Sequence, residues 1–587
     1  MIKILKFLTK KDWLFILCSF VFVIAQVYLD LKLPDYMSEI TMLVQMPGSE
    51  MSEILKSGGY MLLCALGSLV ASFIVGYFAA RIASNLSWML RADVYDKIEG
   101  FSMAEINKFS TSSLITRSTN DITQVQNIVA MGLQLIMKAP ITAIWAIGKI
   151  LGKGWEWTTA TGIALFTIIL LIAIIMVFVV PRFKKVQGLT DKLNLVTREN
   201  LTGIRVVRAY NAEGYQNEKF ENVNNEVTKN NLVINRSMGL IMPGMMFVLN
   251  ILSLSIYLIG AYLINDASME NKITLFSDMI VFSSYSMQVI MSFIMLTMIF
   301  IMMPRASVSA KRILEVLNTK ESIIDGHGNI EHTTDEGEIE FKNVSFRYPD
   351  AQDSEYVLRD ISFKAKAGQT VAIIGATGSG KTSLINLIPR FYDTCEGEVL
   401  VGGVNVKHYK QKHLNNILGY VHQKAVLFTG NVSSNVAYGD NGKGQYSHED
   451  IKKAIDIAQG TEFVSKMEDT YKSSISQGGT NVSGGQRQRL SIARAICREP
   501  KIYIFDDSFS ALDYKTDRKL RSVLKKETKG ATNLIVAQRI GTIIDADKII
   551  VLDEGQIVGM GTHEELMKNC KVYQEIAYSQ LSKEELA

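Results

Sequence analysis

Six long apolar stretches in the first half of this 587-residue chain restrict its fold more than any other feature. Crossing a bilayer as a helix takes roughly 20 residues, and each stretch is long enough to do so. They lie at about 13–33, 57–81, 127–151, 157–181, 239–264 and 274–304. The fourth contains no charged residue between Ile163 and Val180. Because lipid cannot satisfy backbone polar groups, this half is expected to form a bundle of six membrane-spanning helices.

The distribution of Lys and Arg predicts the orientation of these helices. Four Lys precede the first stretch, and the two long polar connections, Arg81–Gln126 and Arg182–Arg236, hold five and ten basic residues. The short connections hold only Lys56, Lys153 and Lys272. Cytosolic segments of membrane proteins carry the excess of positive charge. We therefore expect a multi-pass protein of the cytoplasmic membrane with a cytosolic N-terminus and two cytosolic connections.

Both long connections are expected to be helical. Residues 101–122 and 205–223 have apolar residues at helical spacing beside charged ones. This periodicity favours helical arms that end in short helices and contact another domain. Residues 1–12 combine four Lys with apolar residues, and they are expected to form an amphipathic helix on the inner membrane surface.

The sixth stretch carries a row of methionines at helical spacing, and two alternatives stay open for it. Met is flexible and polarizable, so the row either packs in the core or against lipid, or forms a wall that adapts to varied apolar ligands. The row comprises Met287, Met291, Met295, Met298 and Met302. Lys138 lies within the third stretch and Asp278 near the start of the sixth. Charged side chains inside a membrane face a cavity or a partner, unless they lie at the membrane–water interface.

The second half has the pattern of an α/β domain. From Gly337 onward, short apolar runs alternate with helical stretches and Gly-rich turns. The predicted organisation is therefore an interfacial helix at 1–12, an all-α transmembrane domain at 13–318, a polar linker at 319–336 and an α/β domain at 337–587.

A phosphate-binding motif follows the apolar run Thr370–Ile374 and precedes a helical segment. It has the form G-x4-G-K-[ST], in which glycines let backbone N–H groups face phosphates at a helix N-terminus. Lys381 is expected to reach the β- and γ-phosphates, and Thr382 to ligate Mg²⁺. The expected ATP-binding residues here are Gly375, Ala376, Thr377, Gly378, Ser379, Gly380, Lys381, Thr382 and Ser383.

Two carboxylates end a second apolar run, Lys501–Asp507. A buried parallel strand of this kind delivers a carboxylate to the metal of a phosphate-binding site. Asp506 is expected to hold Mg²⁺, and Asp507 occupies the position of a general base. Between the two motifs, Asn481–Leu490 reads NVSGGQRQRL, which a simple glycine turn before a helix does not explain.

Together these motifs make the chain resemble a half-transporter of the ATP-binding-cassette exporter superfamily over nearly its whole length. The segment VSGGQ at 482–486 is close to the signature LSGGQ of that family. The resemblance implies that Tyr348 stacks on adenine, that Gln423, after the central strand, senses Mg²⁺ and the membrane domain, and that Asp513 lies in the loop that crosses to the opposite subunit. Two nucleotide domains sandwich two ATP molecules in this family, each held by one phosphate loop and the signature of the other domain. The signature residues expected to contact ATP are Ser483, Gly484, Gly485 and Gln486.

Two positions depart from the family pattern. The catalytic Glu after the magnesium Asp is Asp507 here, and the switch His is Gln538. A milder change places Gln477 where a Glu is expected before the signature. The binding residues are thus intact while the turnover residues, Asp507, Gln538 and Gln423, include two weakened ones. The pattern resembles the degenerate subunit of heterodimeric bacterial multidrug exporters, whose partner half-transporter carries the catalytic Glu and the switch His.

The expected function is ATP-driven export of hydrophobic or amphipathic compounds by such a heterodimer. The alternatives are a dedicated peptide or lipid exporter, a homodimer that tolerates both changes, an importer on the same fold, and a regulatory ATP-binding module without transport. The six spans argue against the last. Five scattered Cys give no metal-ligand spacing, and a net charge of +4 gives no support for a nucleic-acid partner.

Overall fold

The computed structural model describes residues 3–46, 48–151, 153–326, 337–349, 356–442 and 444–580. The chain divides into two compact units. The helical unit comprises Met1–Asp96 and Ile115–Asn318, and the nucleotide unit comprises Lys97–Leu114 and Thr319–Ala587. Most of the expected linker, residues 327–336, lies outside the described residues.

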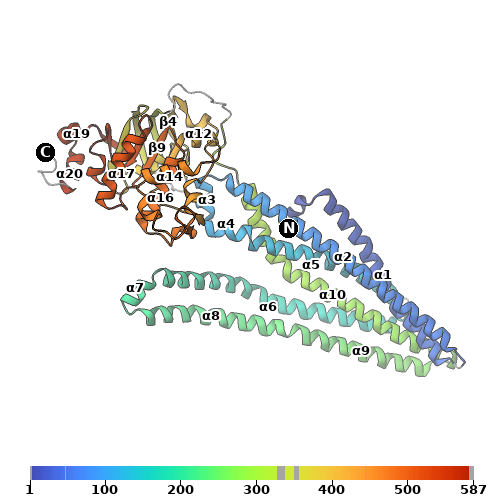
Figure 1. Ribbon diagram of the computed structural model, residues 1–587. Helices are drawn as coiled ribbons and strands as arrows, with labels where there is room; N and C mark the ends of the chain where they lie inside the picture. The colour runs from blue at the N-terminus through green and yellow to red at the C-terminus, as the bar shows by residue number, and fades with distance from the viewer. Residues whose placement is uncertain are drawn as a thin grey trace. The chain divides into compact units, whose positions relative to one another are not determined.

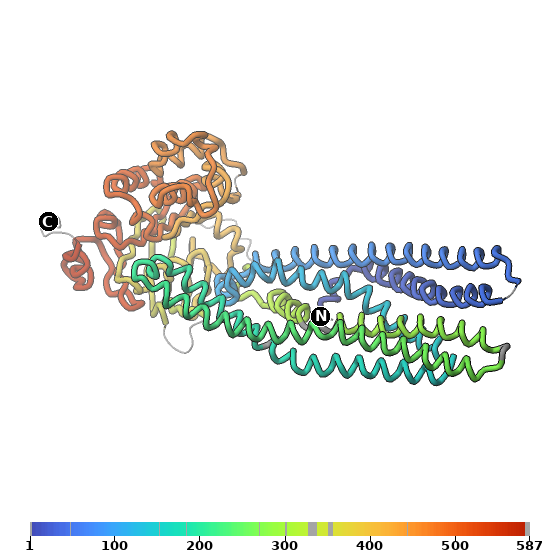
Figure 2. Tube along the Cα trace, turned by 90° about the horizontal axis from the view of Figure 1, so that it is seen from below, coloured from blue at the N-terminus to red at the C-terminus, as the bar shows by residue number. Residues whose placement is uncertain are grey.

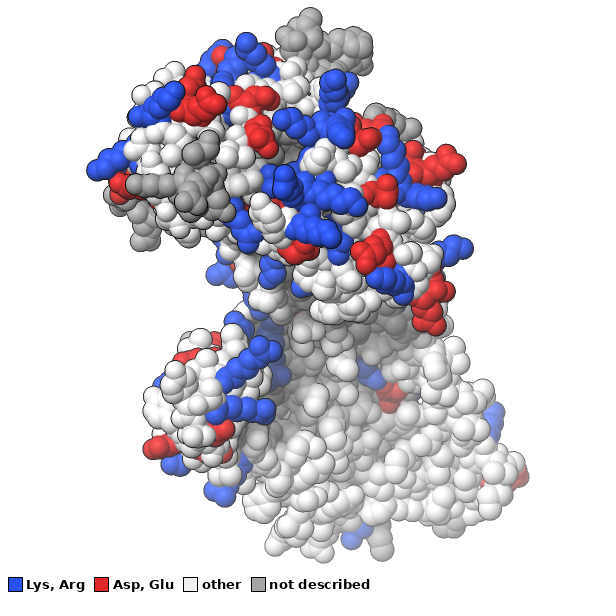
Figure 3. Space-filling model, turned by 60° about the vertical axis from the view of Figure 1, so that its left-hand side comes forward, with Lys and Arg blue, Asp and Glu red and all other residues white. Residues whose placement is uncertain are grey.

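Six helices of the helical unit are long and apolar enough to cross a membrane, as predicted. Each covers one of the expected apolar stretches to within two residues, and the six helices can be followed in Figures 1 and 2. Their bounds are α1 Lys10–Gln45, α2 Met51–Glu99, α5 Asn120–Ile150, α6 Trp155–Thr202, α9 Ile241–Asp266 and α10 Met269–Asn318. Within this unit α10 packs along α5, α1 and α9, and α6 packs along α8 (Glu213–Gly239) and α9. In Figure 3 the visible face of the unit is largely uncharged, whereas charged side chains of both signs crowd the nucleotide unit.

The expected helix over residues 1–12 differs in the structure. A four-residue 3-10 helix, Ile4–Phe7, is followed by α1, which begins at Lys10. The cause is a capping box, because Thr9 Oγ1 accepts a hydrogen bond from the Asp12 backbone N–H at 3.2 Å. Asp12 in turn accepts the Thr9 N–H at 2.9 Å, and Asn85 Nδ2 donates to both of its oxygens. The chain therefore starts its first membrane helix inside the segment expected to lie on the surface.

Both long connections are helical, which confirms that prediction. α6 extends to Thr202, α7 (Ile204–Ala209) turns the chain, and α8 leads back into α9. Val206 of α7 and Tyr210, which directly follows this helix, are 61% and 80% exposed. The described part of this chain therefore leaves apolar side chains uncovered at α7. The other connection forms α3 (Met103–Phe109) and α4 (Thr111–Ser118).

The short helix α3 belongs to the nucleotide unit, as expected of an arm that contacts another domain. Asn107 Nδ2 donates to the Tyr392 hydroxyl at 3.3 Å. Glu105 accepts the Ser322 N–H at 3.2 Å while its other oxygen caps α3 at Ser102. These contacts hold α3 against the rest of the nucleotide unit.

The charges at membrane depth are paired. Lys138 of α5 lies 3.0 Å from Asp30 of α1, and Lys153 forms an ion pair with Asp278 of α10. In the methionine row, Met287, Met291 and Met298 are exposed, so they do not pack in the core of this chain. Lipid, a transport cavity or a second chain remains as their environment.

The nucleotide unit contains two main sheets. One has the order β2-β1-β4-β5 and is antiparallel. The other has the order β12-β11-β3-β10-β9-β6, parallel except for β12, and β7 pairs with β8. The strands are β1 Ile339–Phe346, β2 Leu358–Ala365, β3 Thr370–Gly375, β4 Glu396–Val401, β5 Val404–Asn405, β6 Leu418–Val421, β7 Gly430–Asn431, β8 Ser474–Ile475, β9 Ile502–Asp506, β10 Thr532–Val536, β11 Lys548–Asp553 and β12 Gln556–Gly561.

Helices cover these sheets and carry the motifs. All five residues of β9 are buried, as expected of a central parallel strand. The helices are α11 Lys381–Asn386, α12 Gln411–Ile417, α13 Val432–Val436, α14 His448–Ile457, α15 Thr461–Val464, α16 Gly484–Cys497, α17 Tyr514–Glu527, α18 Ile540–Ile543, α19 His563–Asn569 and α20 Lys571–Gln580.

Candidate nucleotide site

The carboxyl ends of four parallel strands bring the site residues together. β3 leads into the phosphate loop (residues 375–383), β9 into Asp507, β10 into Gln538, and β6 into Gln423. Ligands of parallel sheets bind beyond this edge. One expectation needs correction: β6 is the edge strand of its sheet, not a central one, so Gln423 reaches the site from the side.

The phosphate loop has a backbone that its glycines permit. Gly378 and Gly380 have φ values of +87° and +95°, in the left-handed region that side chains disfavour. A Cβ on Gly375 would lie 2.0 Å from the carbonyl oxygen of Leu552. Lys381 Nζ donates to the carbonyl oxygens of Gly375 and Ala376 at 3.0 and 2.7 Å. The ammonium group is thus held inside the loop, where burial lowers the pKa of Lys381.

Thr382 and Asp506 form a pair of oxygen donors next to this loop. Thr382 Oγ1 donates to Asp506 Oδ1 at 3.1 Å. Burial, opposed by this hydrogen bond and reinforced by the neighbouring Asp507 carboxylate, raises the pKa of Asp506 to about 6. A hydroxyl and a carboxylate this close together fit the oxygen preference of Mg²⁺. The donor set therefore suits the metal that the sequence predicts.

Asp507 is held by two side-chain amides. Gln538 Nε2 and Gln423 Nε2 both donate to Asp507 Oδ2, at 3.0 and 3.4 Å. The backbone of Asp507 has φ +43°, a left-handed conformation that costs a non-glycine residue about 1 kcal/mol. Burial raises the pKa of this carboxyl group. Asp507 is therefore a fixed acceptor whose position the two glutamines define.

These residues line a cavity of about 230 Å³. Sequence reasoning predicted most of its lining, but it missed Val357, which belongs to no motif, and Val536, which opens the switch segment Val536–Arg539 without having been assigned a role. Val357 precedes β2 and donates its N–H to the Phe346 carbonyl, so only the strand pairing brings it to the cavity. The lining comprises Val357, Thr377, Gly378, Gly380, Lys381, Thr382, Ser383, Gln423, Asp506, Asp507, Val536 and Gln538.

Tyr348 lies next to the phosphate loop in an aromatic group. Its ring packs edge-on against Phe346 and Tyr392, with centroids 5.0 and 5.1 Å apart. Its hydroxyl lies 2.8 Å from Ser383 Oγ. The ring is therefore fixed one hydrogen bond from the loop, and its stacking on adenine stays a prediction.

The signature residues form a separate half-site. Ser483 caps α16, since its backbone N–H donates to Gln486 Oε1 at 2.9 Å and its Oγ accepts the Gln486 N–H at 3.3 Å. Ser483 and Gly484 are exposed, and a Cβ on Gly484 would meet nothing within 4 Å, so the first turn of α16 is open on this side. Asp513 caps α17 through the Thr516 N–H at 3.0 Å. None of the described residues lining the 230 Å³ cavity comes from 483–486 or is Asp513.

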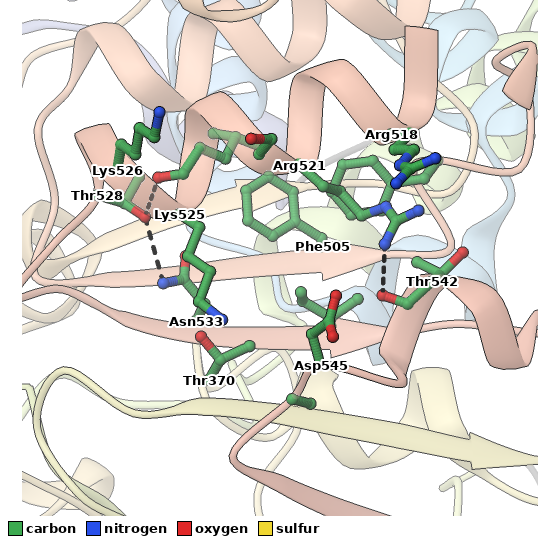
Figure 4. Close-up of a pocket in the computed structure, with 15 residues that line it drawn as sticks. Thr370, Phe505, Arg518, Arg521, Lys525, Lys526, Thr528, Asn533, Thr542 and Asp545 are labelled. Carbon is green, nitrogen blue, oxygen red and sulfur yellow. Dashed lines mark hydrogen bonds between the residues drawn. The ribbon is translucent and has the colours of Figure 1, made fainter. Parts of the chain in front are cut away.

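A second cavity of about 380 Å³ lies between α17 and the sheet (Figure 4). Phe505 of β9 lines it on the side of the sheet, and Arg518, Arg521 and Lys525 of α17 line it as well (Figure 4). Arg521 is engaged by Asp517 and donates to the Thr542 carbonyl oxygen at 3.2 Å. This cavity contains none of the predicted site residues among those described, so the larger cavity is not the nucleotide site.

Two family models match the chain: the ABC transporter transmembrane region over residues 14–320 and ABC transporter over residues 358–510. An uncharacterized ABC transporter ATP-binding protein of Mycobacterium tuberculosis is 37% identical over 527 residues, which is 89% of this chain and 87% of that protein. An ATP-dependent lipid A-core flippase of Aliivibrio fischeri is 29% identical over 534 residues, which is 90% of this chain and 89% of that protein. A bacterial Atm1-family ABC exporter with ATP bound superposes with a TM-score of 0.78 at 23% identity, over 99% of both chains.

Proposed function

This chain belongs to the ABC transporter family, and from that premise we propose that it is the degenerate-site half of a heterodimeric exporter of hydrophobic or amphipathic compounds. Its family makes it an ATP-binding transport ATPase and a multi-pass membrane protein. We further place its N-terminus and nucleotide unit in the cytosol of the cell, on the strength of the Lys and Arg distribution.

The observation that carries the proposal is the fixed Asp507. Its side chain is one methylene shorter than Glu, which withdraws the carboxylate by about 1.5 Å, and a misplacement of about 1 Å costs roughly 10²-fold in rate. The residue at the switch position, Gln538, donates an amide to this carboxylate. An amide offers no ionisable nitrogen, in contrast to the imidazole of a His. Binding of ATP is therefore retained while its hydrolysis at this site is slow.

The binding residues support retention of ATP. Lys381 places its ammonium within the loop that faces the phosphates. Thr382, Asp506 and Gln423 are the residues that would hold Mg²⁺, which supplies charge neutralisation at the phosphate oxygens. Tyr348 offers its ring to the adenine, and its hydroxyl contacts Ser383 at the end of the phosphate loop.

The signature of this chain serves the other site. Ser483–Gln486 point the N-terminus of the 14-residue helix α16 at open space, which suits the γ-phosphate of an ATP held by a partner. In the proposed heterodimer the partner supplies the catalytic Glu and the switch His. The competent site thus depends on residues of both chains.

A lipid substrate is the second candidate. Relatives named ATP-dependent lipid A-core flippases are 29% and 30% identical to this chain. The exposed Met287, Met291 and Met298 are compatible with either an apolar compound or an acyl chain. Reconstitution of the purified complex into vesicles separates the two, because a labelled lipid changes leaflet in one case and a hydrophobic dye leaves the vesicle in the other.

The partner is tested by tagging this chain in its native membrane, extracting it gently and identifying what co-purifies. The proposal predicts a second half-transporter in one-to-one ratio, with Glu and His at the positions equivalent to Asp507 and Gln538. Recovery of this chain alone as a dimer would overturn the heterodimer.

A further inference from the structure

Gln580, the last residue of α20, forms two hydrogen bonds with the backbone around Gln538. Its Nε2 donates to the Gln538 carbonyl oxygen at 2.7 Å, and its Oε1 accepts the Ile540 N–H at 2.8 Å. Residues Ala537–Arg539 join β10 to α18 and belong to neither a helix nor a strand; we call them the switch loop. Backbone polar groups outside regular structure need such partners. One side chain therefore satisfies the loop on both sides of Arg539.

The helix that carries Gln580 is anchored in the nucleotide unit. Tyr573 and Ala577 of α20 are fully buried in a cluster that includes Ile540 and Ile543 of α18. The same cluster contains Ile374 of β3, the strand that leads into the phosphate loop. α20 therefore holds Gln580 at a defined position relative to the switch loop and the nucleotide site.

The switch loop is also fixed at its other end. The Ala537 N–H donates to the Ile373 carbonyl oxygen at 3.1 Å. Between this point and the bonds from Gln580, the side chain of Gln538 extends to Asp507 Oδ2. The direction of the Gln538 amide thus depends on a backbone carbonyl that Gln580 holds.

We propose that Gln580 is a positioning residue: it holds the switch loop so that the Gln538 side chain, which lines the cavity beside the phosphate loop, can reach the γ-phosphate of ATP held by this chain. The inference rests on the proposed function, because only ATP bound in the phosphate loop gives Gln538 this partner. ADP has no γ-phosphate, so the contact of Gln580 strengthens the binding of ATP and leaves that of ADP unchanged. The C-terminal helix thereby sets the preference of the retained site for ATP.

The test uses the full-length chain in its membrane complex. Radiolabelled 8-azido-ADP with Mg²⁺ is photo-crosslinked to this chain, and unlabelled ATP or ADP is added as competitor. For Gln580→Ala we expect about a tenfold loss of affinity for ATP, as for the loss of one hydrogen bond to a charged group, and no change for ADP. Gln580→Glu keeps the acceptor for Ile540 but loses the donor for Gln538, and we expect the same loss.

Gln574→Ala is the matched control, because Gln574 lies on the same helix and donates to the Met567 carbonyl oxygen instead. It should leave the affinities for both nucleotides unchanged. Equal losses of ATP and ADP affinity in Gln580→Ala would show a merely structural role and overturn the inference, as would an unaltered ATP affinity. A wild-type chain that takes up no label would overturn the proposed function and the inference with it, whereas normal labelling with unaltered competition in the variant would overturn the inference alone.

Discussion

Gln538 Nε2 donates to Asp507 Oδ2 at 3.0 Å, so the residue at the switch position binds the residue at the base position directly. Gln423 donates to the same oxygen from the edge strand β6. The uncharged amide groups of Gln538 and Gln423 thus form a hydrogen-bond network with the carboxylate of Asp507, beside Lys381 and Asp506. Under the proposed function, this network accounts for a site that keeps the residues that bind ATP and hydrolyses ATP slowly.

Loss of the signature serine should remove most ATPase activity of the complex. Ser483 and Gly485 both lie outside the phosphate loop of this chain, but in the proposed heterodimer they complete the competent site of the partner. Ser483→Ala and Gly485→Asp should therefore both impair that site. Steady-state ATPase assays of the purified complex should show at least a tenfold loss for either variant.

Ser447→Ala controls for the helix cap, because Ser447 forms the same kind of capping box with Asp450 on α14. Removing either cap costs about 1 kcal/mol of stability. Ser447→Ala should keep its activity. If the two serine variants lost activity equally, the effect would be one of folding, and the assignment of the signature would be wrong.

Truncation of the Tyr348 side chain should weaken the binding of ATP and of ADP equally. Stacking of a base on an aromatic ring is worth about 1–3 kcal/mol, so Tyr348→Ala should lower both affinities roughly tenfold or more in competition labelling. Tyr348→Phe keeps the ring and loses only the hydroxyl contact with Ser383, so it should remain near wild type. Normal nucleotide binding in Tyr348→Ala would remove this residue from the site.

Lys138 and Asp30 should stabilise the helical unit as an ion pair, so the effects of replacing them on stability should not be additive. Lys138→Met leaves Asp30 as an unpaired charge at membrane depth, which we expect to destabilise the helical unit by about 2 kcal/mol. The double variant Lys138→Met with Asp30→Asn should recover most of that loss in thermal unfolding of the solubilised complex. Lys56→Met, at an exposed position, is the control for the loss of a positive charge. Additive losses in the double variant would argue against a direct pair.

Acidification should loosen the contact between α19 and α20. Burial lowers the pKa of His563, and its Nδ1 lies 2.8 Å from the Tyr573 hydroxyl. A histidine with a depressed folded pKa contributes stability above its unfolded value of about 6.5 and loses it as the pH falls through the folded value. The melting temperature should therefore drop between pH 7 and pH 5 by more in wild type than in His563→Asn. Parallel pH profiles of the two proteins would contradict this.

The spans and the phosphate loop were predictable because their signals are local. An uncharged run such as Ile163–Val180 can form a membrane-spanning helix without contacts from the rest of the chain, because a helix satisfies its own backbone hydrogen bonds. The glycines before Lys381 likewise permit the phosphate loop through their own backbone freedom. The bounds of the first helix were not predictable from apolarity, because the capping box of Thr9 and Asp12, braced by Asn85 from another helix, decides where α1 begins.

The arrangement around Asp507 could not be read from spacing alone. Gln423 and Gln538 are 115 residues apart, and they meet on one oxygen only because β6, β9 and β10 are neighbours in the sheet. The contact of Gln580 with the switch loop depends likewise on how α20 packs on α18. A sequence motif identifies which residues can act, whereas strand order and helix packing decide which of them touch.

The proposed heterodimer is tested most directly by the ATPase rate of the complex that carries Asp507→Glu and Gln538→His in this chain. If this chain provides the degenerate site of a heterodimer, restoring a second turnover site should raise the total rate about twofold, because the partner site already supplies nearly all of it when this one is slowed roughly 10²-fold. An unchanged or lower rate would contradict the geometry assigned to Asp507 and Gln538. A rise on the order of 10²-fold would contradict the heterodimer, since it would mean that every site of the complex is of this kind.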